Sequence, residues 1–147
     1  MSVCTKSPET SKHNVTCKSS NLIYCITCKT CKKQYVGQTS NTITKRFYSH
    51  FHNIKHSKAT DGVSLHFSRP DHRGQSDIKI HVLDFIKLPP KTDRAKALRL
   101  EIERMWIHRL RCPEPRGLNI LTKNCQPLSS PALQQRGPIP FLVLLKP

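Results

Sequence analysis

Residues 21–38 read Asn-Leu-Ile-Tyr-Cys-Ile-Thr-Cys-Lys-Thr-Cys-Lys-Lys-Gln-Tyr-Val-Gly-Gln, and they contain two short β-prone runs around a polar connection. Two such runs joined by a short polar segment are typical of a β-hairpin. With a tight turn at the centre, antiparallel counting places Cys28 opposite Cys31 and Tyr24 opposite Tyr35. The sequence therefore predicts a hairpin that pairs two thiols and two phenols, although a metal bound at the turn would distort this register.

Three further elements follow along the chain. Capping-type residues at 39–41 precede a stripe of apolar side chains with helical spacing, formed by Ile43, Phe47, Phe51 and Ile54. Residues 77–86 alternate in hydrophobicity and predict a strand with one buried face. Residues 93–111 predict the longest helix, whose core-facing side carries Leu98, Ile102, Met105, Trp106 and Arg109.

The composition divides the chain into three parts. Residues 1–19 are rich in Ser, Thr and Lys and predict a flexible basic lead-in. Residues 20–125 hold the periodic elements and are long enough for one domain. Residues 126–147 carry five of the 11 prolines and predict a disordered tail.

The charge balance points to a polyanionic partner. Lys plus Arg number 25 against 9 acidic residues, a formal net charge of +16. Nucleic acid is the first expectation and an anionic membrane surface the second, while a basic surface that only aids solubility is the plain alternative. No apolar run reaches membrane-spanning length and the N-terminus lacks a signal-like apolar segment, so we expect an intracellular, nuclear protein. The lysines expected to contact phosphates are Lys29, Lys32, Lys33, Lys45, Lys55 and Lys58.

Seven cysteines in an intracellular chain favour metal binding over disulfides. Cys28 and Cys31 form a Cys-x₂-Cys pair, and His66 and His72 form a His-x₅-His pair. Together they supply the four ligands of a closed, structural Zn²⁺ site. Cys25 or Cys17 remain alternative ligands, and a group of reduced thiols with unrelated histidines is the simpler reading.

A second set of polar residues fits phosphodiester hydrolysis. This reaction requires an activated water, neutralisation of the phosphate charge and stabilisation of the leaving oxygen. A carboxylate can hold Mg²⁺, an arginine can grip a phosphate, and a tyrosine or histidine can take a proton from water. The candidates are Tyr24, Tyr35, Arg46, His50, Glu103 and Asn119.

Several of these assignments have competitors. Arg46 and His50 lie four residues apart on one helix and share neighbouring faces, but His52 and His56 are alternative partners. Glu101 competes with Glu103 as the metal-binding carboxylate.

The motifs resemble the GIY-YIG nuclease domain. Leu22-Ile23-Tyr24 and Tyr35-Val36-Gly37 are similar to its two opening motifs, with Leu22 in place of the first glycine and Val36 at the middle of the second. The segment from Arg46 to His50 resembles the Arg-x-x-x-His helix. The sequence Glu103-Arg104-Met105-Trp106-Ile107 resembles the Glu-x-x-Trp-Ile helix, and Gly117-Leu118-Asn119 resembles the terminal Asn motif.

The resemblance implies an α/β (α+β) fold with a small, mainly antiparallel three-stranded sheet flanked by helices. It implies that Tyr24 and Tyr35 frame the water or the phosphate, with Tyr24 as the general base. It also implies that Arg46 grips the phosphate and His50 assists proton transfer. Glu103 would then hold one Mg²⁺ ion, and Asn119 would tie the chain end to the site.

Within that family the chain is most similar to the endonuclease domain of Penelope-like retroelements. The segment from Cys28 to Thr39, together with His66, His72 and Trp106, carries this similarity. In that subgroup a zinc finger of two Cys and two His is threaded through the nuclease. A reverse transcriptase accompanies the nuclease in such elements and is absent from this chain, so it is an expected partner only in a longer parent protein.

Two functions follow from these patterns. The leading prediction is a Mg²⁺-dependent DNA endonuclease with a structural zinc and low sequence specificity. The rival is a zinc-stabilised nucleic-acid-binding module without catalysis, which would bind zinc and DNA but not cut. A basic secreted factor is a third reading, disfavoured by the odd cysteine count.

Overall fold

The computed structural model describes residues 15–120, so the predicted tail and most of the predicted lead-in lie outside the described residues. A three-stranded antiparallel sheet with the order β2-β1-β3 forms its centre. The strands are β1 (Leu22–Cys28), β2 (Gln34–Thr39) and β3 (Ile78–Phe85). The helices are α1 (Ile43–Lys55), α2 (Gly62–Phe67) and α3 (Asp93–Arg109), and the predicted fold class is confirmed.

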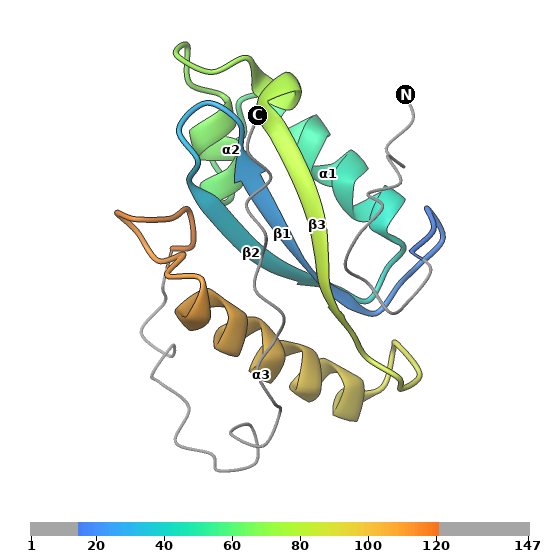
Figure 1. The fold of residues 1–147 in the computed structure, drawn as a ribbon. Coiled ribbons are helices and arrows are strands. Elements are labelled where there is room, and N and C mark those ends of the chain that lie inside the picture. Colours follow the sequence, from blue (N-terminus) through green and yellow to red (C-terminus); the bar gives the residue numbers. More distant parts are fainter. Residues whose placement is uncertain (1–14, 121–147) are drawn as a thin grey trace.

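The sheet separates two layers of helices (Figure 1). Even-numbered residues of β1, such as Tyr24 and Ile26, pack against α1 and α2. The odd-numbered Ile23 packs against α3 through Ile102 and Trp106. Because side chains alternate across a strand, one short strand supplies both cores.

The hairpin register differs from the predicted one by two residues. Tyr24 lies opposite Gly37, and Tyr35 lies opposite Ile26, so the prediction that the two tyrosines face each other is wrong. Four residues separate Cys28 from Lys33, whose carbonyl accepts the Cys28 N–H at 2.9 Å, so the turn is longer than a tight one. A shift of two residues preserves the faces of a strand, and both tyrosines therefore still point to the α1 side.

Capping side chains define where the helices begin. Thr42, rather than residues 39–41, caps α1 by accepting the N–H of Lys45. Asp61 caps α2 and exchanges hydrogen bonds with Ser64 in a capping box. Thr92 caps α3 through the N–H of Ala95.

A buried arginine attaches α3 to the sheet. Arg99 is 5% exposed and donates to the side chains of Gln38 on β2 and Asn21 before β1, and to the carbonyl of Pro90. Arg109, predicted to face the core, is instead exposed, and its guanidinium lies 5.6 Å from the centre of the Trp106 ring. The arginine at 99 therefore fixes the helix that carries Glu103 one turn later.

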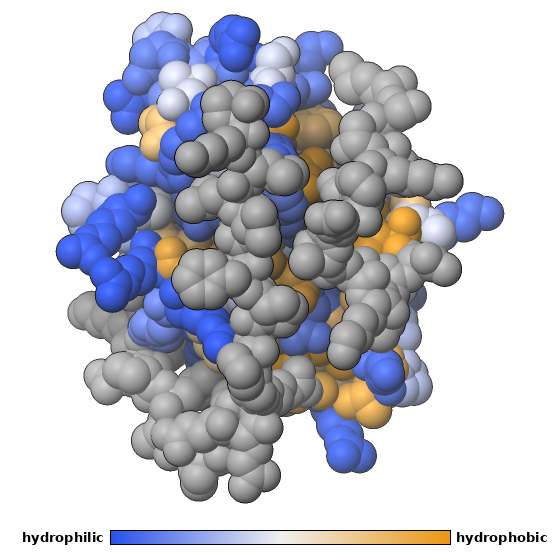
Figure 2. Space-filling model, viewed as in Figure 1, coloured by the Kyte–Doolittle hydropathy of each residue, from blue (hydrophilic) through white to orange (hydrophobic). Residues whose placement is uncertain are grey.

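Hydrophilic residues cover much of the described surface, with apolar residues visible between them (Figure 2). Five of the six predicted phosphate-contacting lysines are exposed and Lys33 is half-buried. No helix of the described residues is long and apolar enough to cross a membrane.

Candidate active site and metal centre

A buried phenol lies at the centre of the polar residues predicted from the sequence. Tyr24 on β1 is fully buried, and its Oη accepts a hydrogen bond of 2.8 Å from Arg46 Nε. The same oxygen lies 2.8 Å from His50 Nε2. Both partners come from α1, where a spacing of four residues places them on one side of the helix.

Tyr35 completes this group from β2. Its ring centre lies 6.5 Å from that of Tyr24 and 6.0 Å from that of His50. We call Tyr24, Tyr35, Arg46 and His50 the tyrosine cluster. Burial raises the pKa of Tyr35 to about 12, although Arg46 opposes this, and burial also raises the pKa of Tyr24. Both phenols are therefore protonated in the free protein at neutral pH.

Gly37 allows the two tyrosines to approach each other. A Cβ atom at this position would lie 2.6 Å from Tyr24 Oη and 2.8 Å from Tyr35 Cε1, closer than real contacts permit. The glycine was noticed in the sequence only as part of a motif. Its function here is steric, because any side chain would displace the phenol rings of Tyr24 and Tyr35.

Glu103 reaches the cluster from the opposite layer. It lies on α3, which packs against the edge strand β2, and it is half-buried. Burial raises the pKa of Glu103 to about 7, while the Arg46 guanidinium and a hydrogen bond to the Gln38 backbone lower it. Its charge also acts on both tyrosines. The carboxylate and the guanidinium, from opposite faces of the sheet, are thus electrostatically coupled.

Asn119 binds the backbone of β2. Among residues 15–120, no hydrogen bond is found between its side chain and the tyrosine cluster. Its Oδ1 accepts from Val36 N at 2.9 Å and its Nδ2 donates to Val36 O at 2.8 Å. Val36 lies between Tyr35 and Gly37 on the edge strand. The Asn119 side chain therefore pairs with the outer edge of β2 and holds this strand in place.

One residue of this region was missed in the sequence. Asp61, the cap of α2, places Oδ2 at 3.5 Å from His50 Nδ1. The sequence shows Asp61 only as the end of a polar loop before Gly62. Its distance from His50 along the chain left no periodic signal that joins them. The competing His52 and His56 are exposed and lie beside each other at the end of α1, with ring centres 4.4 Å apart and tilted planes.

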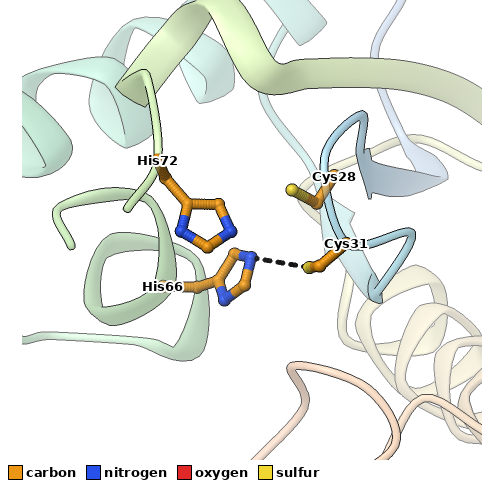
Figure 3. A group of neighbouring side chains, drawn as sticks. All are labelled: Cys28, Cys31, His66 and His72. Atoms are coloured by element: carbon orange, nitrogen blue, oxygen red, sulfur yellow. Dashed lines mark hydrogen bonds between the residues drawn. The ribbon is translucent and has the colours of Figure 1, made fainter. Parts of the chain in front are cut away.

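The four predicted zinc ligands come together at the other end of β1. The ligand atoms of Cys28, Cys31, His66 and His72 all lie within 4.8 Å of one another. Figure 3 shows the thiols of the hairpin turn facing the imidazoles of α2 and the following turn, with Cys31 Sγ 3.3 Å from His66 Nε2. We call these four residues the Cys-His cluster. Cys25, the alternative ligand, is buried on the other face of β1 and does not join it.

The donor set fits a zinc ion. His72 is buried, and its Nε2 has no hydrogen-bond partner among the described residues. Its Nδ1 lies 3.0 Å from Asp71 Oδ1. A carboxylate near one ring nitrogen, with the ring beside a thiol such as that of Cys31, is the usual setting of a metal-binding histidine. Two thiolates and two imidazoles would close a tetrahedral site without room for a catalytic water.

Asp77, another residue missed in the sequence, joins the two halves of this cluster. Its carboxylate accepts from Thr30 Oγ1 at 3.0 Å and from Arg73 N at 2.9 Å. Thr30 lies between the two cysteines, and Arg73 follows His72. The buried carboxylate of Asp77 therefore holds both ligand-bearing segments in register.

Comparison with protein families matches residues 20–115 to the GIY-YIG catalytic domain. The match covers more than half of the chain. The chain belongs to the GIY-YIG family.

Solved structures agree with this assignment. The catalytic domain of the homing endonuclease I-TevI superimposes with a TM-score of 0.53 at 23% identity, over 68% of this chain and 97% of that one. A mutant of the catalytic domain of the intron endonuclease I-TevI gives a TM-score of 0.54 at 25% identity, over 67% and 91%. A search of curated proteins found no match.

GIY-YIG domains form a family of phosphodiester hydrolases that use a divalent metal ion. In this member Glu103 is the half-buried carboxylate coupled to Arg46, which fits a single oxygen ligand for such an ion. Glu101 lines a different hollow in the surface, which lies between the end of β3 and α3. The geometry therefore favours Glu103 over Glu101.

Proposed function

We propose that this protein is a DNA endonuclease that hydrolyses phosphodiester bonds with one divalent metal ion. The observation that carries the proposal is the hydrogen-bonded array Arg46–Tyr24–His50, electrostatically coupled to Glu103 within a GIY-YIG domain. A bound Mg²⁺ held by Glu103 would neutralise charge on the phosphate and the leaving oxygen.

Arg46 is the phosphate-binding group in this proposal. It is half-exposed, and it contacts Tyr24 through Nε. Binding through Nε leaves the outer guanidinium nitrogens able to donate to two phosphate oxygens. A phosphate held there lies beside the Tyr24 hydroxyl.

Tyr24 accepts the proton of the attacking water. Burial disfavours a free phenolate, because the charged form loses hydration. The phenol therefore passes its own proton to His50 Nε2, 2.8 Å away, as it takes the proton of water. Tyr35, on the same face, limits the space in which the phosphate and the water can lie.

The Cys-His cluster has a structural function in the proposal. A Zn²⁺ ion bound there would join the β1–β2 turn to α2, and thereby fix the strands that carry both tyrosines. The exposed lysines make sequence-independent contacts with DNA phosphates, so binding weakens steeply with salt.

The zinc ligands within the nuclease domain support an origin in a Penelope-like retroelement, with a reverse transcriptase in a longer parent protein and action in the nucleus. The coding sequence upstream of this domain tests that origin. A reverse transcriptase reading frame is the expected result, and an unrelated frame would contradict it.

Nicking of a supercoiled plasmid in Mg²⁺ tests the enzymatic proposal. Arg46→Ala and Glu103→Gln should each lower the nicking rate by about 10²–10³-fold, as the loss of one transition-state contact does. Glu101→Gln, two residues away on the same helix, is the matched control and should cut like the parent. A parent protein that binds DNA and zinc but does not nick would favour the non-catalytic module.

A further inference from the structure

Asp61 uses its two carboxylate oxygens for two different purposes. Oδ1 accepts the N–H of Ser64 at 2.8 Å and caps α2. Oδ2 lies 3.5 Å from Nδ1 of His50, whose side chain is 2% exposed. An asparagine would cap a helix equally well, so capping alone does not explain the second oxygen.

The hydrogen bonds of Tyr24 determine which nitrogen of His50 carries the proton. Tyr24 Oη accepts from Arg46 Nε, and because this hydroxyl is fully buried, its own proton also needs an acceptor within the protein. Among residues 15–120 the acceptor found for it is His50 Nε2 at 2.8 Å, which is unprotonated when it takes this role. The proton of neutral His50 is then on Nδ1, which faces Asp61.

We propose that Asp61 is a positioning residue that holds His50 in the Nδ1–H tautomer, so that Nε2 receives the proton of Tyr24. The inference rests on the nuclease function proposed above. In the reaction, water loses a proton to Tyr24 Oη while its oxygen bonds to phosphorus and the bond to the leaving oxygen breaks. The original Tyr24 proton moves to His50 Nε2, and the imidazolium formed lies against the Asp61 carboxylate before it releases the proton to solvent.

The electrostatics of the cluster agree with this function. Burial raises the pKa of Asp61, but hydrogen bonds from His50 and Ser64 outweigh it and hold the pKa at about 2. The carboxylate is therefore ionised at neutral pH. Its charge also acts on Arg46 and Tyr35, so Asp61 influences three of the four members of the tyrosine cluster.

The test has a structural part that does not depend on cleavage. The ¹⁵N chemical shifts of the His50 ring in the full chain report which nitrogen is protonated. We expect a protonated Nδ1 and an unprotonated Nε2 at neutral pH. A proton on Nε2 would overturn the inference whether or not the protein cuts DNA.

The kinetic part uses Asp61→Asn, which keeps the helix cap and removes the charge. The amide should favour the other tautomer, and an equivalent change behind the histidine of a serine protease costs about 10⁴-fold. We expect the nicking rate to fall by about 10²–10⁴-fold and the ¹⁵N signature to reverse. An unchanged rate in Asp61→Asn would refute the function assigned to the carboxylate.

Ser64→Ala is the matched control. It removes the Ser64 hydroxyl that accepts from the Asp61 N–H, and so breaks the capping box, but it keeps the Ser64 N–H that donates to Asp61 Oδ1. We expect a lower melting temperature with an unchanged tautomer and an unchanged nicking rate below that temperature. A parent protein that never nicks, with the expected tautomer present, would reject the nuclease proposal while the placement of Asp61 stood.

Discussion

The tyrosine cluster and the Cys-His cluster lie on the same face of β1, but they differ in the metal-binding groups that they offer. Tyr24 and Cys28 are four residues apart on this strand, a separation of about 13 Å. Two thiols and two imidazoles supply the four donors of the Cys-His cluster, whereas a single hard carboxylate serves the tyrosine cluster and would leave other positions on an ion open. In the proposed function, one domain thus separates a metal that would hold the fold from a metal that would assist the reaction.

The two regions also differ in how they are held together. The Cys-His cluster draws its residues from the hairpin turn and from the segment around α2, and an ion bound by all four would join the two segments directly. The tyrosine cluster is joined instead by direct hydrogen bonds between Tyr24 and its partners Arg46 and His50. Loss of zinc should therefore affect the fold, and loss of magnesium should affect the reaction alone.

The largest expected effect comes from removal of zinc. A structural zinc site contributes about 10–16 kcal/mol of binding free energy, which exceeds the net free energy of unfolding of a typical small domain. Cys28→Ser should therefore abolish the cooperative thermal transition and reduce bound zinc below one ion per chain. Circular dichroism with metal analysis checks this, and Cys25→Ser is the control, since Cys25 lies on the other face of the strand. A folded, zinc-free Cys28→Ser protein would remove the distinction between the two clusters.

Gly37→Ala should damage the tyrosine cluster and leave the Cys-His cluster intact. The added methyl group would lie 2.6 Å from Tyr24 Oη, so the phenol or the strand must move. Overpacking of this kind costs about 1–3 kcal/mol, and a displacement near 1 Å costs about 10²-fold in rate. Nicking assays and zinc stoichiometry measure the two effects separately. A variant that retains full activity would show that the approach of the two tyrosines does not matter for the reaction.

Asp77→Ala is the converse experiment, directed at the Cys-His cluster. Without the carboxylate, Thr30 and Arg73 lose their common acceptor, and the two ligand segments are less well positioned. Outer-shell changes lower metal affinity by about 10–100-fold. Competition with a chelator should show this weakening, while nicking at saturating zinc stays close to that of the parent. Equal zinc affinity in the two proteins would contradict the positioning function.

The smallest effect concerns the charge of Glu103. Its pKa is about 7 in the folded protein and 4.5 in the reference state, so folding favours the protonated form. The stability that the protonated carboxyl contributes to the folded state is complete below pH 4.5 and is lost as the pH rises through about 7. Without Mg²⁺, Glu103→Gln should therefore melt a few degrees above the parent at pH 8, and the difference should shrink as the pH falls. Thermal scans across pH measure it, with Glu101→Gln as a control that should show a difference independent of pH.

Local patterns predicted most of the elements. The strand at 77–86 and the helix at 93–111 agree with β3 and α3 to within two residues at each end. The apolar stripe of α1 is also correct, because Ile43, Phe47 and Ile54 are buried. Helical and strand periodicities follow from which side chains leave water, and that information lies within a single segment.

The errors lie where segments meet. The turn between Cys28 and Cys31 is longer than the sequence suggests, so Tyr24 pairs with Gly37 and not with Tyr35. Asp61 and Asp77 escaped notice because each acts on a residue brought near by folding. In the sequence, Asp61 has only the pattern of a helix cap and Asp77 only that of a residue before a strand. The folded structure places their carboxylate oxygens beside His50 and Thr30.

The sequence by itself determined the chemical inventory: two tyrosines, an arginine, a histidine and a glutamate in GIY-YIG order, and two Cys and two His with the spacing of a zinc site. Only the tertiary structure decided that Glu103 lies close enough to Arg46 for their charges to interact, and that Asp61 lies behind His50. The physical reason is that residue types and their spacing are properties of single segments and can be read within each of them. Register, layer packing and the direction of a hydrogen bond depend on contacts between segments that no single stretch contains.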